Sequence, residues 1–146
     1  MSIEILPAAP EHIPRIHAIE TQSFATSWTP AQLKLYLTTS GCVLLIAVEG
    51  AEIVGYLCFD SVLDEGNIAN LAVAPEHRRR GIGQKLLRAA EDRGRGLGLR
   101  FLNLEARKSN AAAVALYEKL GYRRVGLRKE YYVNPIEDAV LMTKYL

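Results

Sequence analysis

The segment Val73-Ala-Pro-Glu-His-Arg-Arg-Arg-Gly-Ile-Gly83 limits the possible folds of this chain more than any other. A predicted strand ends at its start, three arginines follow, and two glycines open an amphipathic helix. The start of a helix has unpaired main-chain N–H groups and a partial positive charge, and glycines allow an anion to come close. The segment therefore predicts a phosphate site between a strand and a helix. The alternative is a solvated basic helix start whose glycines serve only the turn.

Two common phosphate motifs do not match this segment. A Walker loop requires Lys directly after its last Gly, where this chain has Gln84. A dinucleotide-binding fold has a tight turn between strand and glycine, whereas the stretch Ala74 to Arg80 intervenes here, and Leu86 replaces its third small residue. Glu105 lies roughly where a ribose-binding acid would be, but 146 residues hardly accommodate a second substrate domain, so this stays a distant alternative.

Hydrophobic periodicity predicts seven strands and four helices around this segment. The expected strands are residues 3–5, 42–48, 53–59, 66–73, 100–105, 122–132 and 139–145, and the expected helices are 10–21, 29–38, 82–93 and 109–120. The order places one β-α-β unit in the middle of a largely antiparallel sheet. We therefore predict an α+β fold, a mixed, mostly antiparallel sheet flanked by helices, in a single domain that spans residues 1–146.

Local signals define several of the expected helix ends and faces. Thr29 and Gln32 have the spacing of a capping box, and Ser109 is expected to cap the last helix. In the helix from Ile82, the apolar stripe Ile82, Leu86, Leu87 and Ala90 lies opposite Lys85, Arg88, Glu91 and Asp92. Gly94, Gly96 and Gly98 are expected to end this helix.

Composition excludes several functional classes. With 18 basic and 16 acidic residues the net charge is +2, which argues against direct nucleic-acid binding. No apolar stretch is long enough to cross a membrane, and a cytoplasmic location is expected. Cys42 and Cys58 flank a predicted turn and could face each other on paired strands, although two buried reduced thiols are favoured. His12, His17 and His77 have no paired spacing to cysteines or carboxylates, so no metal is expected.

The pattern Arg78-x-x-Gly81-x-Gly83, preceded by Asn70-Leu-Ala-Val73, resembles the acetyl-coenzyme A signature of the GNAT acetyltransferases. This resemblance implies a GNAT fold with acetyl-coenzyme A as cosubstrate and a direct acetyl transfer to an amine. It also implies that the strand holds the thioester and pantetheine arm and that the loop amides hold the pyrophosphate. The implied cofactor-binding residues are Leu71, Ala72, Val73, Arg79, Arg80, Gly81, Ile82, Gly83, Gln84 and Asn110.

The chain is also similar to the RimI branch of that family, whose members acetylate the N-terminal alanine of a small-subunit ribosomal protein. The similarity lies in the segments 62–65, 104–122 and 128–132, which occur in the same order and at matching separations. It implies that Glu105 is the general base and Tyr117 the general acid. Ala106 and Ser27 depart from the pattern, in which Val and Pro are common at these positions.

The residues themselves leave alternatives to these roles. Glu105 at a strand end could simply be solvated, and Tyr117 could belong to the apolar core. Trp28 and Tyr131 are expected to line a groove for the N-terminal peptide, with partly buried apolar anchors as the alternative. An α-amine has a pKa of about 7.7 to 8.0 against about 10.4 for lysine, so a modest base suffices for an N-terminus.

Other acceptors and another functional class stay open from the sequence. A GNAT enzyme for lysine or a small amine would share the cofactor loop, and so would a coenzyme A binding module without catalytic activity. Glu20, Asp64 and Glu65 are expected to favour a basic peptide.

Overall fold

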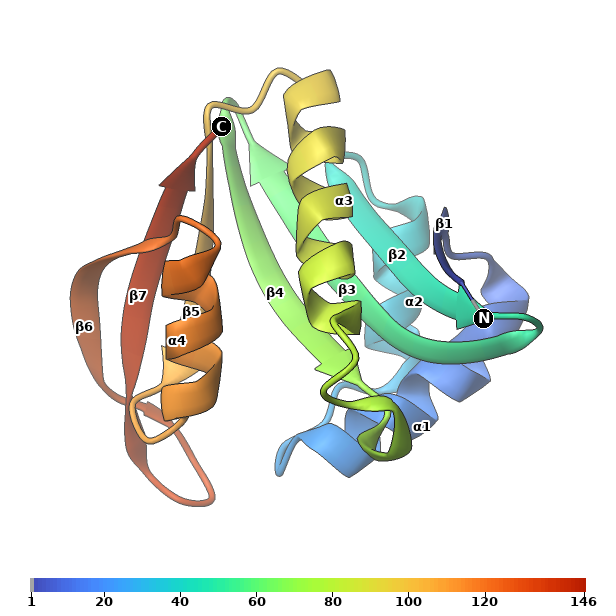
Figure 1. The fold of residues 1–146 in the computed structure, drawn as a ribbon, viewed down its shortest axis with the longest axis horizontal. Helices are drawn as coiled ribbons and strands as arrows, with labels where there is room; N and C mark the ends of the chain where they lie inside the picture. The colour runs from blue at the N-terminus through green and yellow to red at the C-terminus, as the bar shows by residue number, and fades with distance from the viewer. Residues whose placement is uncertain (1) are drawn as a thin grey trace.

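A computed structural model describes residues 2–146, in which one seven-stranded sheet has the order β1-β2-β3-β4-β5-β7-β6 (Figure 1). The strands are β1 (Ile3–Pro7), β2 (Cys42–Glu49), β3 (Glu52–Val62), β4 (Glu65–Val73), β5 (Phe101–Arg107), β6 (Arg123–Tyr132) and β7 (Glu137–Tyr145). The helices are α1 (Ile13–Ser23), α2 (Pro30–Thr38), α3 (Ile82–Gly96) and α4 (Ala111–Lys119), with 3-10 turns at Pro10–His12 and Pro75–His77. The predicted α+β class and the predicted order of strands and helices are confirmed.

Helices cover both faces of the sheet, with α1 and α2 on one face and α3 and α4 on the other (Figure 1). Successive residues of a strand point to opposite faces, so a strand buried on both sides is apolar throughout. In β2, Val43 and Leu45 pack in the core under α3, whereas Leu44 and Ile46 pack in the core under α1 and α2. The continuous apolar runs of β2 and β3 are therefore explained by the two layers of helices.

The pair β4 and β5 is the only parallel pair among the described strands, and it separates early. Pairing runs only from Glu65–Phe101 to Asn67–Asn103, after which the two strands diverge (Figure 1). The Asn103 amide donates to Glu65 Oε1 at 2.6 Å and to Asn67 Oδ1 at 3.1 Å, and its oxygen accepts from Thr143 at 2.6 Å. Asn103 thus joins β4, β5 and β7 at the point where the sheet splits.

Most local signals in the helices are confirmed, with two corrections. Thr29 and Gln32 form the predicted capping box of α2. The cap of α4 is Asn110 and not Ser109, because the Asn110 side chain accepts a hydrogen bond from Ala113 N at 3.2 Å. Gly94 lies inside α3 and does not end it. A glycine is needed there for packing, because a Cβ at this position would lie only 3.0 Å from a methyl group of Leu146.

The predicted polar position of Glu91 on α3 is also wrong, because this side chain is 1% exposed. Its carboxylate accepts hydrogen bonds from Lys144 Nζ at 2.9 Å and from the Tyr122 hydroxyl at 3.1 Å. These partners make burial of the charge possible, since a buried carboxylate needs donors to replace water. Glu91 thereby connects α3 to β7 at the level where β4 and β5 are still paired, since Lys144 is in register with Leu102.

The two cysteines are free and do not face each other directly. In the β2–β3 register Cys42 pairs with Asp60, and Cys58 pairs with Leu44. Cys58 is buried as expected, but Cys42 is only half-buried because it starts an edge of the paired region. The expectation of two reduced thiols therefore agrees with this geometry, while the burial of Cys42 was overestimated.

Candidate active site

A cleft of about 640 Å³ opens where β4 and β5 diverge. Its walls come from the end of α1 and the segment after it, from β4, the end of β5, α4 and the β6–β7 connection. It is lined by Glu20, Ser23, Phe24, Ala25, Thr26, Trp28, Asn67, Ile68, Ala69, Asn70, Leu71, Leu104, Glu105, Ala106, Arg107, Asn110, Ala113, Tyr117, Tyr131, Tyr132 and Val133. Six residues selected from the sequence meet in this cleft: Trp28, Leu71, Glu105, Asn110, Tyr117 and Tyr131.

The β4 wall of the cleft offers main-chain groups. Beyond Asn67 the edge of β4 that faces β5 has no strand partner within residues 2–146. On the other edge Leu71, Ala72 and Val73 pair with β3. A strand edge without a partner can bind an extended ligand through its main-chain N–H and C=O groups. Residues 71–73 lie on this strand, and their role in holding the arm of the cosubstrate stays a prediction.

The loop between β4 and α3 presents a set of free amides. In the part of the chain that the structure describes, no group accepts a hydrogen bond from the main-chain N–H groups of residues 79 to 84. Arg79 and Gly81 both have positive φ angles, 64° and 78°, which curl the loop before α3 begins. Successive N–H groups in such a turn at a helix start form a concave anion site. The geometry fits a pyrophosphate.

Gly81 and Gly83 differ in what the fold itself requires. Gly81 needs its left-handed backbone, whereas Gly83 lies in the first turn of α3 with an ordinary helical backbone. A Cβ added at either position would meet no atom within 4 Å. Nothing in the fold explains a glycine at position 83, so the open space beside it is available to a ligand.

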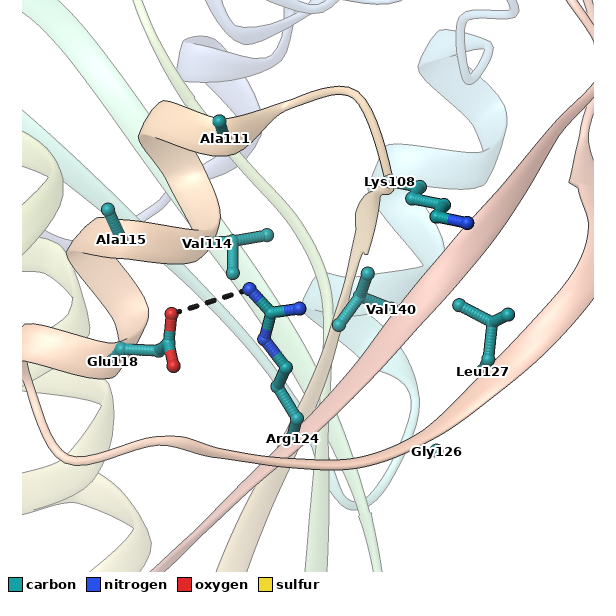
Figure 2. A pocket seen from close by; sticks show the side chains of 9 residues that line it. All are labelled: Lys108, Ala111, Val114, Ala115, Glu118, Arg124, Gly126, Leu127 and Val140. Atoms are coloured by element: carbon teal, nitrogen blue, oxygen red, sulfur yellow. Dashed lines mark ion pairs between the residues drawn. The ribbon is translucent and has the colours of Figure 1, made fainter.

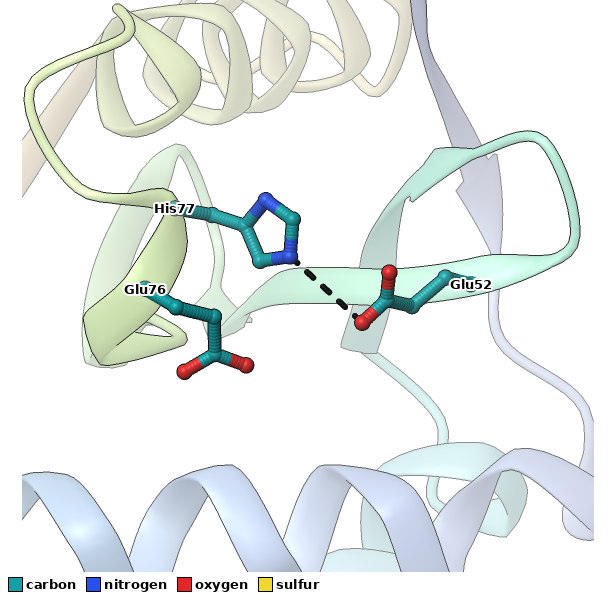
Figure 3. A group of neighbouring side chains, drawn as sticks. All are labelled: Glu52, Glu76 and His77. Atoms are coloured by element: carbon teal, nitrogen blue, oxygen red, sulfur yellow. Dashed lines mark ion pairs between the residues drawn. The ribbon is translucent and has the colours of Figure 1, made fainter.

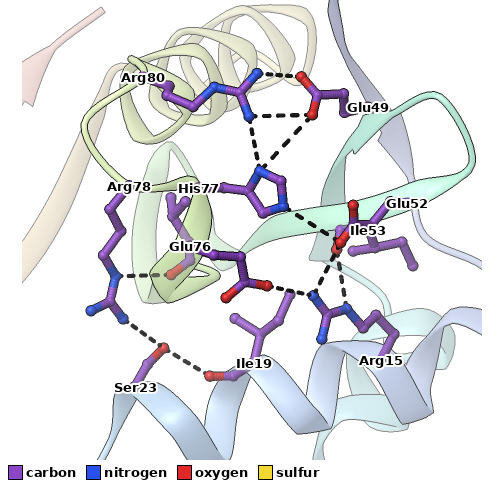
Figure 4. Close-up of polar contacts among 11 residues, drawn as sticks. Arg15, Ile19, Ser23, Glu49, Glu52, Ile53, Glu76, His77, Arg78 and Arg80 are labelled. Carbon is purple, nitrogen blue, oxygen red and sulfur yellow. Dashed lines mark hydrogen bonds and ion pairs between the residues drawn. The ribbon is translucent and has the colours of Figure 1, made fainter.

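Two of the three arginines in this loop are engaged within the protein (Figure 4). Arg78 donates from Nε to Val73 O at 3.0 Å and reaches the Ser23 hydroxyl at 3.4 Å. The Arg80 guanidinium forms a two-pronged ion pair with Glu49, which raises the pKa of Arg80. The main-chain N–H of Arg80, by contrast, has no acceptor among residues 2–146 and is available to a phosphate.

The remaining residues assigned to the loop differ in exposure. The Ile82 side chain is 1% exposed in the core, so its contribution to a phosphate site is restricted to its N–H group. Gln84 faces a separate shallow hollow of about 500 Å³ beside Ile5 and Arg88. Arg79 is exposed and has no ion pair within residues 2–146, which leaves its guanidinium available for an anion.

Glu105 lies on the β5 wall, where its side chain is 30% exposed. Arg128 Nη2 is 3.9 Å from Glu105 Oε1. The Glu105 carboxylate lies close enough to Tyr131 and Tyr132 that it adds to the effect of burial on both hydroxyls, and the pKa of Tyr132 rises to about 12. Glu105 is thus an accessible carboxylate at the aromatic end of the cleft and can accept a proton there.

Tyr117 and Asn110 enter the cleft from α4, two turns apart. Burial raises the pKa of the Tyr117 hydroxyl, so this group keeps its proton to a higher pH than an exposed tyrosine does. Its ring contacts the ring of Tyr122 edge-on, with centroids 6.2 Å apart. A protonated hydroxyl in a cleft can serve as a proton donor.

Trp28 and Tyr131 both line the cleft, Trp28 from the segment after α1 and Tyr131 from β6. The Trp28 ring stacks on the Tyr36 ring, with 5.2 Å between the two centroids. Tyr131 is 45% exposed, and the guanidinium carbon of Arg128 lies 4.9 Å from the centroid of the Tyr131 ring. Both aromatic rings therefore have packing partners and also border the cleft. Their role in binding a peptide stays a prediction.

Sequence reasoning missed the polar side chains that support these walls. Arg107 and Asn70 both line the cleft and both bind other residues of its walls. Glu20, expected to attract a basic peptide, is 0% exposed and faces inward. Glu65, expected to do the same, accepts a hydrogen bond from Asn103. Hydrogen-bonding capacity in the sequence was the only available signal for these supports.

A cluster of carboxylates and histidine lies outside the cleft (Figure 3). Ligand atoms of Glu52, Glu76 and His77 all lie within 4.8 Å of one another, although the sequence had suggested isolated histidines. Arg15 Nη2 lies 3.9 Å from Glu52 and 3.6 Å from Glu76, so one guanidinium pairs with both carboxylates (Figure 4). The cluster is accounted for by these ion pairs.

Figure 2 shows a smaller hollow of about 330 Å³ between α4 and β6. Glu118 and Arg124 form an ion pair across it, with 3.6 Å between Oε1 and Nη2. None of the residues picked from the sequence lines this hollow.

Of the helices in residues 2–146, none combines the length and the apolar character that a membrane crossing requires.

Comparisons with known proteins agree with this geometry. The family model described as "Acetyltransferase (GNAT) family" matches residues 13–122. The chain is 36% identical over 141 residues to the [ribosomal protein bS18]-alanine N-acetyltransferase of Escherichia coli (strain K12), covering 94% of this chain and 88% of that protein. The crystal structure of the Escherichia coli ribosomal-protein-S18-alanine N-acetyltransferase superimposes with a TM-score of 0.90 at 29% identity, covering 99% of this chain and 94% of that one.

A more distant structure shares the fold alone. Arabidopsis thaliana NAA60 in complex with acetyl-CoA has a TM-score of 0.90 at 18% identity, covering 99% of both chains.

Proposed function

Because the chain belongs to the acetyltransferase (GNAT) family, we propose that it acetylates the N-terminal alanine of the small-subunit ribosomal protein bS18. GNAT acetyltransferases use acetyl-coenzyme A. One observation carries the proposal: Glu105, Tyr117, Trp28 and Tyr131 all line the same cleft, which also borders β4. The identity of 36% to the Escherichia coli enzyme supports the same acceptor.

In this proposal, the loop after β4 and the free edge of β4 hold the cosubstrate. The main-chain N–H groups of residues 79 to 84 bind the pyrophosphate, and Arg79 adds a charge. The edge formed by Leu71, Ala72 and Val73 binds the arm, and Asn110 contacts it from α4. This arrangement directs the thioester toward the cleft, where the catalytic side chains lie.

Glu105 and Tyr117 divide the proton transfers of the reaction. Glu105 takes a proton from the α-amine, directly or through water, as the nitrogen attacks the thioester carbonyl and forms the amide C–N bond. The C–S bond then breaks, and Tyr117 gives its proton to the departing thiolate, so that coenzyme A leaves as a thiol. Tyr117 regains a proton from solvent, and Glu105 releases one. No acyl-enzyme intermediate is required.

The accessible Glu105 suits an N-terminal amine better than a lysine. An α-amine has a pKa of about 7.7 to 8.0, so a large fraction is already neutral near pH 7.5, whereas lysine with a pKa of about 10.4 is almost fully charged. An extended peptide end fits between the Trp28 segment and Tyr131. A ribosomal-protein acceptor also implies that the reaction takes place in the cytoplasm.

The test is release of coenzyme A from acetyl-coenzyme A with three peptides. The first carries the alanine-starting end of bS18, the second has the same sequence with a blocked N-terminus, and the third has a blocked N-terminus and an internal lysine. Release with the first peptide alone is expected. Release with the third peptide would favour a lysine acetyltransferase, and binding of coenzyme A without release would favour another amine or a binding module.

A further inference from the structure

We propose that Glu20 positions the acceptor side of the cleft by holding the segment Phe24 to Trp28 at a fixed distance from β4. The inference rests on the proposed function, which assigns this segment to the acceptor. Glu20 lies outside the proposed proton transfers, because its side chain is fully buried. Its role is therefore that of a positioning residue.

Glu20 is a charged residue on the buried face of α1, beside Ile16 and Ile19. A carboxylate in such surroundings is stable only if donors replace the water it has lost. Three donors do so here. Oε1 accepts from the Tyr56 hydroxyl and from Asn70 Nδ2 at 2.9 Å, and Oε2 accepts from the Trp28 main-chain N–H at 2.8 Å.

The bond to Trp28 fixes a segment that has no helix or strand of its own. Within residues 2–146, it is the only hydrogen bond from residues 25–28 to a residue outside the segment. The other bond is internal, from the Ser27 hydroxyl to Phe24 O at 3.2 Å. Because residues 24–26 and Trp28 form one wall of the cleft, the position of that wall depends on the Glu20 carboxylate.

The other oxygen of the Glu20 carboxylate, Oε1, accepts a hydrogen bond from Asn70 of β4, the strand that is proposed to hold the arm of the cosubstrate. Asn70 lies in β4 directly before Leu71 and also lines the cleft. One buried group thus joins the acceptor wall to the donor wall. Small displacements between reacting groups reduce rates strongly, so loss of this connection is expected to impair acceptor binding and reaction without affecting the phosphate loop.

The three donors to Glu20 respond differently to substitution. The Tyr56 hydroxyl and the Asn70 amide can each turn around and accept a hydrogen bond, whereas the Trp28 main-chain N–H can only donate. Glu20→Gln can therefore keep its oxygen on Trp28 and direct its NH₂ group to the other two residues. Glu20→Met has a similar volume but only a weakly accepting sulfur, so it deprives the Trp28 N–H of its oxygen acceptor.

The experiment uses Trp28 itself, since it is the only tryptophan in the chain. Quenching of its fluorescence by acrylamide measures how freely the segment moves and requires no acceptor. For Glu20→Met we expect stronger quenching, a rise of about tenfold in the acceptor KM and an unchanged dissociation constant for acetyl-coenzyme A. For Glu20→Gln we expect values near those of the parent protein.

The matched control is Glu91→Met, which removes the other buried carboxylate, 1% exposed on α3. It should lower the thermal midpoint but leave Trp28 quenching and the acceptor KM unchanged. Parent-like quenching in a folded Glu20→Met variant would overturn the proposal. Equal changes of quenching and acceptor KM in Glu20→Gln and Glu20→Met would also overturn it, because they would show that the charge of Glu20 matters and not its bond to Trp28.

A second variant and the independence of the quenching readout cover two other outcomes. If Glu20→Met does not fold, Glu20→Asp is measured in the same way, because its shorter side chain withdraws the carboxylate from Trp28; parent-like quenching there would equally overturn the proposal. If the bS18 peptide is not acetylated, the quenching result still tests the role of Glu20, so a wrong acceptor is distinguished from a wrong positioning residue.

Discussion

The guanidinium carbon of Arg107 lies 4.6 Å from the centroid of the Tyr132 ring, so a cation at the end of β5 covers an aromatic ring at the end of β6. The same guanidinium donates to Val133 O at 2.8 Å and to Pro135 O at 2.9 Å, and it pairs with Glu137 at 3.3 Å. Arg107 therefore holds the β6–β7 connection, whose first residues form part of the cleft wall.

Replacement of Arg107 by Ala should release this connection. Two main-chain carbonyls and a carboxylate lose their donor, so we expect the free energy of unfolding to fall by about 1 to 3 kcal/mol. The acceptor KM should rise more than the KM for acetyl-coenzyme A, because the side-chain partners of Arg107 within residues 2–146 include no residue of the loop 79–84. Urea unfolding and steady-state kinetics measure the two effects.

The control for Arg107 is Arg95→Ala, which removes a guanidinium that pairs with the exposed Asp92 at 3.1 Å. Exposed pairs contribute about 0 to 1 kcal/mol, so this variant should behave like the parent protein. An Arg107→Ala variant with a parent-like acceptor KM would show that the connection does not depend on Arg107.

Glu105→Gln should lower kcat by about 10² to 10⁴, the usual contribution of a positioned base. The loss should persist above the pKa of the acceptor amine, because a neutral amine still has to lose a proton as it forms the amide bond. Binding of acetyl-coenzyme A should be unchanged. Glu118→Gln, on the exposed face of α4, is the control, and equal activity of the two variants across the pH range would remove Glu105 from the mechanism.

Tyr117→Phe should lower kcat by about 10² or more, since the thiolate then leaves without a positioned acid. Burial raises the pKa of Tyr117, so in the parent protein this acid should stay protonated, and the reaction should not weaken on the alkaline side below about pH 10. Tyr145→Phe, at a position that is 77% exposed, is the control. Unchanged kcat in Tyr117→Phe would assign the tyrosine to packing.

The parts of the fold that the sequence predicted are those with signals close together in the chain. Thr29 and Gln32 are three residues apart, and the stripe from Ile82 to Ala90 repeats within one helix. The turn from β4 into α3 was predicted for the same reason, because its arginines and glycines all lie within residues 78–83. Local chemistry was sufficient for these features.

The errors concern residues whose partners are distant in the chain. Glu91 was expected on the polar face of its helix, but its partner Lys144 is 53 residues away. Glu20 was expected to favour a basic peptide, but it is buried, and its partner Asn70 is 50 residues away. A helical pattern records only which residues are polar, and it cannot show that a distant donor allows a carboxylate to be buried. The supports of the cleft depend on such pairs.

Alkaline pH should destabilise the protein through its buried tyrosines. Burial, together with the carboxylates of Glu20 and Glu91, raises the pKa of Tyr56 and Tyr122 above the usual value of about 10. Above that pH the unfolded chain loses these protons first, so the folded state binds more protons and the free energy of unfolding falls as pH rises.

Urea unfolding between about pH 8 and about pH 11 measures this dependence. The fall should be smaller in Tyr122→Phe, which has one titrating group fewer. A free energy of unfolding that stays constant over the range would contradict the shifted pKa values.

Gly83→Ala separates the phosphate site from the fold. A Cβ at this helical position meets no protein atom within 4 Å, and Ala is favoured over Gly in a helix by up to about 1 kcal/mol, so the stability should stay equal or rise. If a pyrophosphate binds the loop amides, the new methyl group lies in its space, and the dissociation constant for acetyl-coenzyme A should rise by about tenfold or more. Gly96→Ala, at the other end of α3 and also without a neighbour within 4 Å, should raise stability in the same way and leave the affinity unchanged. Equal affinities of the two variants, measured by calorimetry, would mean that the loop does not approach the phosphates at Gly83.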